Sequence, residues 1–387
     1  MRSVARWGGQ PAPGLDQYSA RLSGEFVPDR SGKWQFGLAS PGDARLLLDG
    51  HVLVERDDAT AAESLFSRGT HEATAEVELI AGQHYALVAE LRLRTPLAQS
   101  GVRIGARPVP PPNARDEALR AAASADVAVV VVGYDGNWES EGRDRINMDL
   151  PGDQDELVRA VVAANPRTIV VVNAGAPVTM DWADEAAAVL QLWFPGMEGG
   201  NALADVLFGE VSPSGRLPTT FPRRLADTPA FAHYPGANGV VQYAEGLLVG
   251  YRHYDKHGVE PRFCFGHGLS YTCFEYGDLR LEPYGDGVRV CLDVSNTGQR
   301  AGAEVVQVYV RDPAAGDDEP DKQLRQFARV DLRAGETRSV TLHLPRRAFA
   351  CWDVAQHTWA VKPGEREVLV GASSRDIRLA ARWSVSG

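Results

Sequence analysis

The chain has 387 residues, which is enough for two or three domains with a large total core. It contains 51 Asp and Glu against 40 Lys and Arg, a formal charge of -11, and no basic run interrupts this acidic composition. These features argue against nucleic acid as a partner. No apolar segment reaches the roughly 18 residues of a membrane-spanning helix, so we expect no membrane partner.

The cysteines point to neither a zinc site nor a disulfide framework. Cys264, Cys273, Cys291 and Cys351 lack C-x-x-C spacing and are few for this length. We therefore predict four buried free thiols and no metal. The first residues, MRSVARWGGQPAPG, lack the apolar stretch of a secretory signal. Together these features favour a cytoplasmic location.

Residues 18–107 show short runs of alternating apolar and polar residues. Asp-Arg-Ser-Gly, Ser-Pro-Gly-Asp and Asp-Gly separate the runs. This pattern is typical of an antiparallel β-sandwich. The proline-rich segment VPPPNARDE at 109–117 then reads as a linker.

Residues from about 114 to 280 alternate between helical and strand patterns. Predicted strands are the apolar runs 126–133, 168–175 and 187–194; predicted helices are 114–125, 153–165 and 199–208. The first run, DVAVVVVG, is continuously apolar, which predicts a strand buried on both faces. This rhythm predicts a mostly parallel sheet with helices on both faces.

The last hundred residues, 286–387, return to period-two alternation. Segments such as GVRVCLDVSNTG, AEVVQVYVRD and TRSVTLHLP predict five or more short strands. That number of strands in this length indicates an immunoglobulin-like β-sandwich.

Two carboxylates follow the first predicted parallel strand. Glu139 and Glu141 lie in NWESEGRDR, residues 137–145, where the strand gives way to a loop. Ligands of open α/β sheets bind at the carboxyl ends of strands. Three further residues are expected to shape and hold this loop, namely Gly142 by a sharp turn and Asp144 and Arg145 by their charges. The pattern predicts a loop that holds a carboxyl group in a fixed place.

The middle zone resembles the α/β sandwich domain of family 3 glycoside hydrolases, the β-glucosidase-like enzymes. WESEGRDR, WFPGMEGGNALADVLFGEVSPSGRLPTTFP, YAEGLLVGYRHYD and FGHGLSYTCF carry the resemblance, in the family's order. The third zone resembles a fibronectin type III-like domain, and the first a lectin-like protective-antigen-type domain that is incomplete at its N-terminus. We therefore predict a multidomain chain with a β-sandwich at 1–108, an α/β sandwich at 109–280 and an immunoglobulin-like sandwich at 281–387.

The resemblance implies a retaining hydrolase of terminal β-linked sugars without a cofactor. Such enzymes use two carboxyl groups about 5–5.5 Å apart, one as nucleophile and one as acid then base. The family's acid/base position falls on Glu141, with Glu139 as the alternative. Trp138 beside them is implied to contact the substrate.

The resemblance also implies a nucleophilic Asp on a (β/α)8 barrel, and this chain has no such barrel. Asp181 precedes Trp182, but it falls where the family has a structural turn, so we reject it as nucleophile. We expect the C-terminal part of a glycosidase, with the barrel on a separate chain or in a missing N-terminal half. The expected ligand is a β-glycoside or oligosaccharide. The alternative is a non-catalytic carbohydrate-binding or scaffold protein.

Aromatic and histidine side chains elsewhere favour structural roles. Trp34, Trp193, Trp352 and Trp359 have the rings to stack on sugars, but their strand-like contexts predict core packing. His233, His253 and His267 lack the i, i+4 spacing of a metal-binding helix, which predicts core or surface positions for them.

Overall fold

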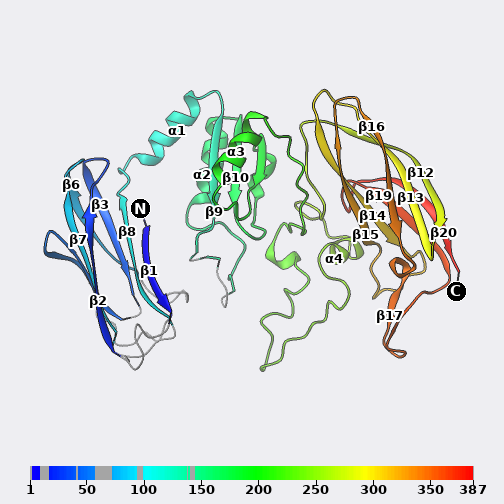
Figure 1. The fold of residues 1–387 in the computed structure, drawn as a ribbon, viewed down its shortest axis with the longest axis horizontal. Coiled ribbons are helices and arrows are strands. Elements are labelled where there is room, and N and C mark those ends of the chain that lie inside the picture. Colours follow the sequence, from blue (N-terminus) through cyan, green and yellow to red (C-terminus); the bar gives the residue numbers. More distant parts are fainter. Residues whose placement is uncertain are drawn as a thin grey trace. The chain divides into compact units, whose positions relative to one another are not determined.

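The computed structural model describes residues 2–8, 17–40, 42–56, 72–93, 99–136, 138–139 and 144–386. They fall into two compact units (Figure 1). The first comprises Met1–Ala125 and Tyr134–Arg145, and the second comprises Asp126–Gly133 and Ile146–Gly387. The three domain boundaries expected from the sequence stay a prediction.

The first unit contains the predicted antiparallel β-sandwich. One sheet has the order β1 (Arg2–Gly8), β8 (Gln99–Pro108), β3 (Gly32–Ala39), β6 (Ala73–Leu79); the other has the order β2 (Tyr18–Phe26), β7 (Tyr85–Leu93), β4 (Asp43–Leu48), β5 (His51–Arg56). Phe26 packs edge-on against both Trp34 and Phe36, with ring centroids 5.1 and 5.2 Å apart. Helix α1 (Ala114–Ser124) follows the sandwich in the same unit. The prediction that Trp34 is a core residue is confirmed, since it is 6% exposed.

The Asp-Gly break in this zone is a hairpin turn. Asp49 and Gly50 join β4 to β5 with φ of 49° and 81°, values that Asp and Gly tolerate best. The Asp49 carboxylate also accepts a 2.7 Å hydrogen bond from the Ala86 backbone N–H on β7. The turn therefore fixes the register of β4 against β5 and ties it to a third strand.

The second unit begins with a parallel three-stranded sheet. Its order is β11 (Ala188–Gln191), β10 (Thr168–Asn173), β9 (Ala128–Gly133), and both pairings are parallel as predicted. The helices of this part are α2 (Gln154–Ala164), α3 (Gly199–Phe208), α4 (Tyr251–Lys256) and the short 3-10 turns η1 (Asp181–Asp184) and η2 (Leu225–Asp227). The helix predicted at 199–208 is confirmed to the residue, since Gly209 ends it in the left-handed conformation.

One prediction for this sheet was wrong. The strand expected to be buried on both faces, β9, has Val129 47% exposed and Val131 60% exposed. Ala128, Val130 and Val132 face the core instead. Alternate exposure of this kind means that one face of β9, the strand at the edge of the sheet, is not covered in this unit.

The C-terminal part is the predicted immunoglobulin-like sandwich. One sheet has the order β12 (Phe274–Tyr284), β13 (Gly287–Asn296), β16 (Thr337–Leu344); the other has the order β15 (Gln323–Leu332), β14 (Gly302–Arg311), β19 (Gly364–Gly371), β20 (Ile377–Val385). Alternate residues of β13, from Val288 to Val294, are at most 1% exposed. A 3-10 turn η3 (Arg346–Phe349) leads to a separate hairpin of β17 (Cys351–Asp353) and β18 (Thr358–Ala360).

Two buried ionic contacts join this sandwich to the preceding segments of the same unit. Arg216 donates to Glu304 at 2.6 Å, and their side chains are 8% and 2% exposed. On α4, the buried Asp255 accepts from Lys322 at 2.7 Å and from Arg375 at 3.1 Å. Removing one partner from such a pair leaves an uncompensated buried charge, so these contacts hold the two parts together.

The cysteine prediction was half right. All four thiols are free, but Cys273 is exposed and the other three are half-buried, so none is fully buried. Cys291 and Cys351 lie on strands β13 and β17, and Cys273 directly precedes β12, where one face of each strand meets solvent. No helix among the described residues is long and apolar enough to cross a membrane.

Candidate functional site

The three parallel strands end at one edge of their sheet. Gly133, the last residue of β9, is paired with Asn173, the last residue of β10. Val172 of β10 is paired with Gln191, which ends β11. The last residues of the three strands therefore lie at one edge of the sheet, the edge where α/β proteins bind ligands.

Gly133 is held by the side chain of Gln154, the first residue of α2. The amide oxygen of Gln154 accepts from the Gly133 N–H at 2.7 Å, and its amide nitrogen donates to the Gly133 carbonyl at 3.1 Å. Gly133 has φ of +153°, and a Cβ atom there would lie 2.0 Å from the Asn173 carbonyl oxygen. Only glycine fits this position, so the exit of the chain from β9 is fixed.

Tyr134 then anchors both ends of the loop that follows. Its side chain is buried, at 9% exposed. The Trp138 ring stacks near it, with centroids 6.3 Å apart and an interplanar angle of 23°. The Arg145 guanidinium lies 4.7 Å above the Tyr134 ring, a cation–π contact. Residues near both ends of the loop therefore contact the Tyr134 ring.

The described residues of the loop place one of the two candidate carboxylates. The backbone N–H groups of Trp138 and Glu139 both donate to the Asp135 carbonyl, at 2.9 and 3.0 Å, which makes a tight turn. The Glu139 side chain is half-buried, whereas Asp144 is exposed. Glu141 and Gly142 lie outside the described residues.

A side-chain hydrogen bond and aromatic rings lie at the ends of β10 and β11. Gln191 donates to the Ala174 carbonyl at 2.6 Å, which ties the end of β11 to that of β10. Trp193 has φ of 58° and packs edge-on against Phe221 at 6.0 Å. The strand expected over 187–194 therefore stops at Gln191, because this left-handed residue turns the chain. Phe194 lies over Gly175 and is 74% exposed.

Asp181 and its neighbour Trp182 face different surroundings. Asp181 is exposed at the start of η1, whereas Trp182 is fully buried and donates to Asp155 of α2 at 2.7 Å. Burial raises the pKa of Asp155, although the hydrogen bond from Trp182 lowers it in part. Trp182 thus joins η1 to α2.

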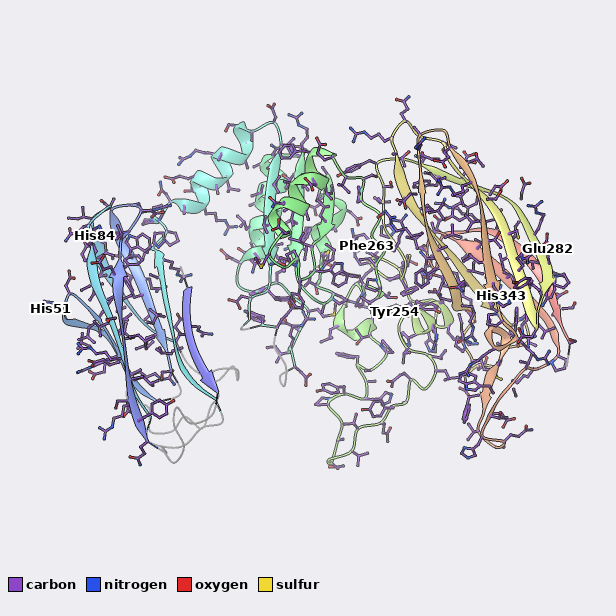
Figure 2. The ribbon with its side chains drawn as sticks, in the orientation of Figure 1. His51, His84, Tyr254, Phe263, Glu282 and His343 are labelled. Carbon is purple, nitrogen blue, oxygen red and sulfur yellow. The ribbon has the colours of Figure 1, made fainter. Side chains whose placement is uncertain are left out.

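One histidine pair escaped the sequence analysis. His257 follows His253 by four residues across the end of α4, and their ring centroids lie 4.7 Å apart. Figure 2 labels Tyr254, whose ring packs edge-on against His253 at 5.4 Å. Burial and the neighbouring His257 lower the pKa of His253. Among the described residues, no group of three or more His, Cys, Asp or Glu side chains is arranged to hold a metal ion.

The structure brings together Trp138, Arg145 and a residue that the sequence analysis missed, Tyr134. It adds Gln154, which holds Gly133 from a distance of 21 residues along the chain. A polar amide in the first turn of a helix that follows a strand-ending glycine is the only sequence signal for this contact. The two rings contact each other, and the amide contacts the residue just before the loop.

Family comparisons agree with this architecture. The sequence model described as "Glycosyl hydrolase family 3 C-terminal domain" matches residues 14–271, which is more than half of the chain. A second, described as "Fibronectin type III-like domain", matches residues 304–374.

Curated relatives and solved structures carry related names. A β-glucosidase of Rhizobium radiobacter is 41% identical over 96% of this chain and 47% of its own length. Probable β-glucosidase J of Aspergillus fumigatus is 43% identical over 90% of this chain and 43% of its own length. The structure of a Kluyveromyces marxianus β-glucosidase in complex with glucose superposes with a TM-score of 0.91 at 35% identity, covering 100% of this chain and 47% of that one. The chain thus spans about half the length of the relatives it matches.

Proposed function

Because this chain belongs to glycoside hydrolase family 3, we propose that it is the C-terminal part of a retaining β-glucosidase-like enzyme that acts on terminal β-linked sugars. In this proposal Glu141 is the acid/base, Glu139 is its fallback, and Trp138 contacts the substrate. The observation that carries the proposal is the loop at residues 134–145. It begins at the carboxyl edge of the parallel sheet, and Gln154 and Tyr134 fix its ends.

The proposed role of Glu141 follows from the chemistry of retention. The protonated carboxyl gives its proton to the glycosidic oxygen while a nucleophilic carboxylate bonds to the anomeric carbon and the aglycone leaves. The resulting Glu141 carboxylate then takes a proton from water, whose oxygen displaces the nucleophile and frees the sugar. General acid–base help of this kind contributes roughly 10²- to 10⁴-fold to the rate.

The nucleophile in this proposal belongs to a barrel on a separate chain or in a missing N-terminal half. The second unit exposes many large apolar side chains between the sheet edge and the C-terminal sandwich. They include Phe194 at 74%, Met197 at 100%, Phe208 at 84%, Tyr243 at 82% and Leu269 at 75%. We propose that the barrel covers these side chains.

The experiment combines the chain with the barrel half of a relative and compares two substrates. p-Nitrophenyl β-D-glucopyranoside measures turnover, and the 2,4-dinitrophenyl glucoside has an aglycone that leaves without an acid. Glu141→Gln should lower p-nitrophenyl glucoside turnover by roughly 10²-fold or more, with a smaller effect on cleavage of the dinitrophenyl glucoside. Azide, which needs no general base, should restore the second step and yield β-glucosyl azide.

Glu139→Gln is the matched variant two residues away. If azide rescue follows Glu139→Gln and not Glu141→Gln, Glu139 is the acid/base. Asp181→Asn should leave all rates unchanged. Activity of the chain without a barrel, abolished by Asp181→Asn, would contradict the proposed division of the catalytic pair.

A non-catalytic carbohydrate-binding or scaffold protein is the second candidate. Sugar binding with no turnover, in a mixture whose barrel half is active with its own partner, would support this candidate.

A further inference from the structure

The hairpin of β17 and β18 carries two tryptophans directly opposite each other. Trp352 pairs with Trp359 in an antiparallel register, so their rings extend from one face of the hairpin. The Asp353 carboxylate accepts from the backbone N–H groups of Ala355 and Gln356, at 2.9 and 3.0 Å. These bonds close the turn, and Figure 1 shows the hairpin below the sheets of its sandwich. The two rings therefore extend from a hairpin whose turn is closed by hydrogen bonds.

The two rings form a corner that is open to solvent. Their centroids lie 5.6 Å apart at an interplanar angle of 70°. Trp352 is 47% exposed and Trp359 is 44% exposed, which corrects the expectation that both are core residues. Their strands are only three residues long and lie outside the two sheets of the sandwich. We call this pair the Trp corner.

Charged and polar groups border the Trp corner. The Arg347 guanidinium lies 4.1 Å from the centre of the Trp359 ring and covers one of its faces. The His357 ring lies 6.4 Å from that of Trp352 at 85°. Arg347 thus fixes one indole from behind, and the exposed surface combines apolar faces with hydrogen-bonding groups.

The indole N–H groups distinguish these tryptophans from buried ones in the same chain. Trp34 donates to the Arg30 carbonyl at 3.1 Å, and Trp182 donates to Asp155 at 2.7 Å. Within the described part of the chain, no protein acceptor is recorded for the N–H of Trp352 or Trp359. A purely apolar occupant would leave both donors unsatisfied, at a cost in free energy. The fitting ligand has an apolar face and oxygen acceptors at its rim.

We propose that the Trp corner is a carbohydrate-binding site for β-linked gluco-oligosaccharides, built from residues other than those of the loop at 134–145. A β-glucosyl ring has its C–H bonds on its faces, which stack on indole, and its hydroxyls at the rim, which accept from the N–H groups. The two rings lie at 70° to each other, so they present apolar surfaces in two directions to a bent sugar chain. The choice of β-glucosides rests on the proposed function. The evidence for a binding site at the Trp corner comes from the hairpin alone.

The test titrates the whole chain with laminarihexaose, cellohexaose and maltohexaose, following tryptophan fluorescence and calorimetry. We expect saturable binding of a β-linked hexaose, with a dissociation constant on the order of millimolar or below, and weaker binding of the α-linked maltohexaose. Trp352→Ala and Trp359→Ala should each weaken binding at least tenfold. Because no hydrolysis is measured, failure here leaves the glycosidase proposal standing, and failure of the glycosidase assay leaves this one standing.

Tyr284→Ala is the matched control, since Tyr284 is also 47% exposed and lies under a guanidinium, that of Arg289 at 4.2 Å. It should bind the sugars like the unaltered chain. Trp352→Phe keeps an aromatic ring without the indole N–H, so it should bind with intermediate affinity. This variant tests the proposal if the alanine variant fails to fold. Unaltered affinity in folded tryptophan variants, no saturable binding of any hexaose, or a dimer that either alanine variant dissociates would overturn the proposal.

Discussion

The side-chain amide of Gln154 holds the backbone of Gly133 from both sides, accepting from its N–H at 2.7 Å and donating to its carbonyl at 3.1 Å. This contact connects the start of α2 to the residue at which β9 becomes the loop bearing Glu139. A helix residue thereby controls where the candidate catalytic loop begins.

Gln154→Ala is expected to disturb the loop more than the fold. Two hydrogen bonds are lost, each contributing about 1 kcal/mol, so the free energy of unfolding should fall by roughly 2 kcal/mol. Turnover in the mixture with a barrel half should fall further than this stability loss explains. Urea unfolding and glucoside hydrolysis measure the two effects.

Gln191→Ala is the control for that variant, because it removes one amide contact, to the Ala174 carbonyl, at the neighbouring strand end. It should cost about 1 kcal/mol of stability with little change in turnover. Equal losses of turnover in both variants would show that Gln154 contributes only stability.

The ion pair between Arg216 and Glu304 leads to a second prediction. Arg378 also lies 3.9 Å from Glu304, so two guanidinium groups face one buried carboxylate. Glu304→Gln leaves both guanidinium groups without the buried carboxylate, so it should lower the free energy of unfolding by about 3–5 kcal/mol. Arg216→Met keeps Arg378 near the carboxylate and should cost less.

The exposed pair Arg329–Asp331 is the control, with a 2.6 Å contact of the same length. Asp331→Asn should change stability by about 0–1 kcal/mol. Urea denaturation at neutral pH compares the three variants. A Glu304→Gln cost as small as that of Asp331→Asn would mean that burial does not govern this pair.

Local patterns predicted much of the fold. Alternation from Val288 to Val294 identified a sandwich strand, and Gly209 marked the end of α3. The patterns failed where the answer depended on distant neighbours. An apolar run could not reveal that β9 is an edge strand, and a strand-like context could not reveal that Trp352 lies on a hairpin outside the sheets.

The candidate site was predicted only in part for the same reason. The sequence identified Trp138 and Arg145 as part of one loop, but Tyr134 and Gln154 act through contacts that no local pattern encodes. The contact of the Arg145 guanidinium with an aromatic ring was not expected from the sequence. Glu141 stays a prediction, since it lies outside the described residues.

Two histidines should make stability fall between neutral and mildly acidic pH. Burial is the largest cause that lowers the pKa of His267 and of His253, with Arg216 and His257 respectively adding to it. The unfolded chain therefore binds more protons near pH 6.5, so stability rises with pH there and is lost as pH falls through the lower folded-state pKa values. His267→Gln should flatten this dependence between about pH 7 and 5. An unchanged slope in unfolding free energy against pH would contradict the assignment to His267.

Asp155 should show the opposite sign. Burial raises its pKa, so the folded state binds more protons than the unfolded state above the ordinary Asp range. The stability from this group is complete below the unfolded pKa and is lost as pH rises through the raised folded pKa. Asp155→Asn keeps an acceptor for Trp182 without the buried charge. At neutral pH it should be at least as stable as the unaltered chain, and this advantage should vanish in acid.

Trp182→Phe separates the hydrogen bond from the charge in that prediction. It removes the donor to Asp155 while keeping a buried aromatic ring, so the carboxylate loses the contact that partly offsets its burial. We expect Trp182→Phe to destabilise the chain at neutral pH by more than in acid, where the carboxyl is neutral. In Asp155→Asn the same substitution should lose this pH dependence. Thermal unfolding of the unaltered chain, the two single variants and the double variant is measured at pH 4 and 7. Equal destabilisation by Trp182→Phe at both pH values would mean that the substitution acts through packing alone.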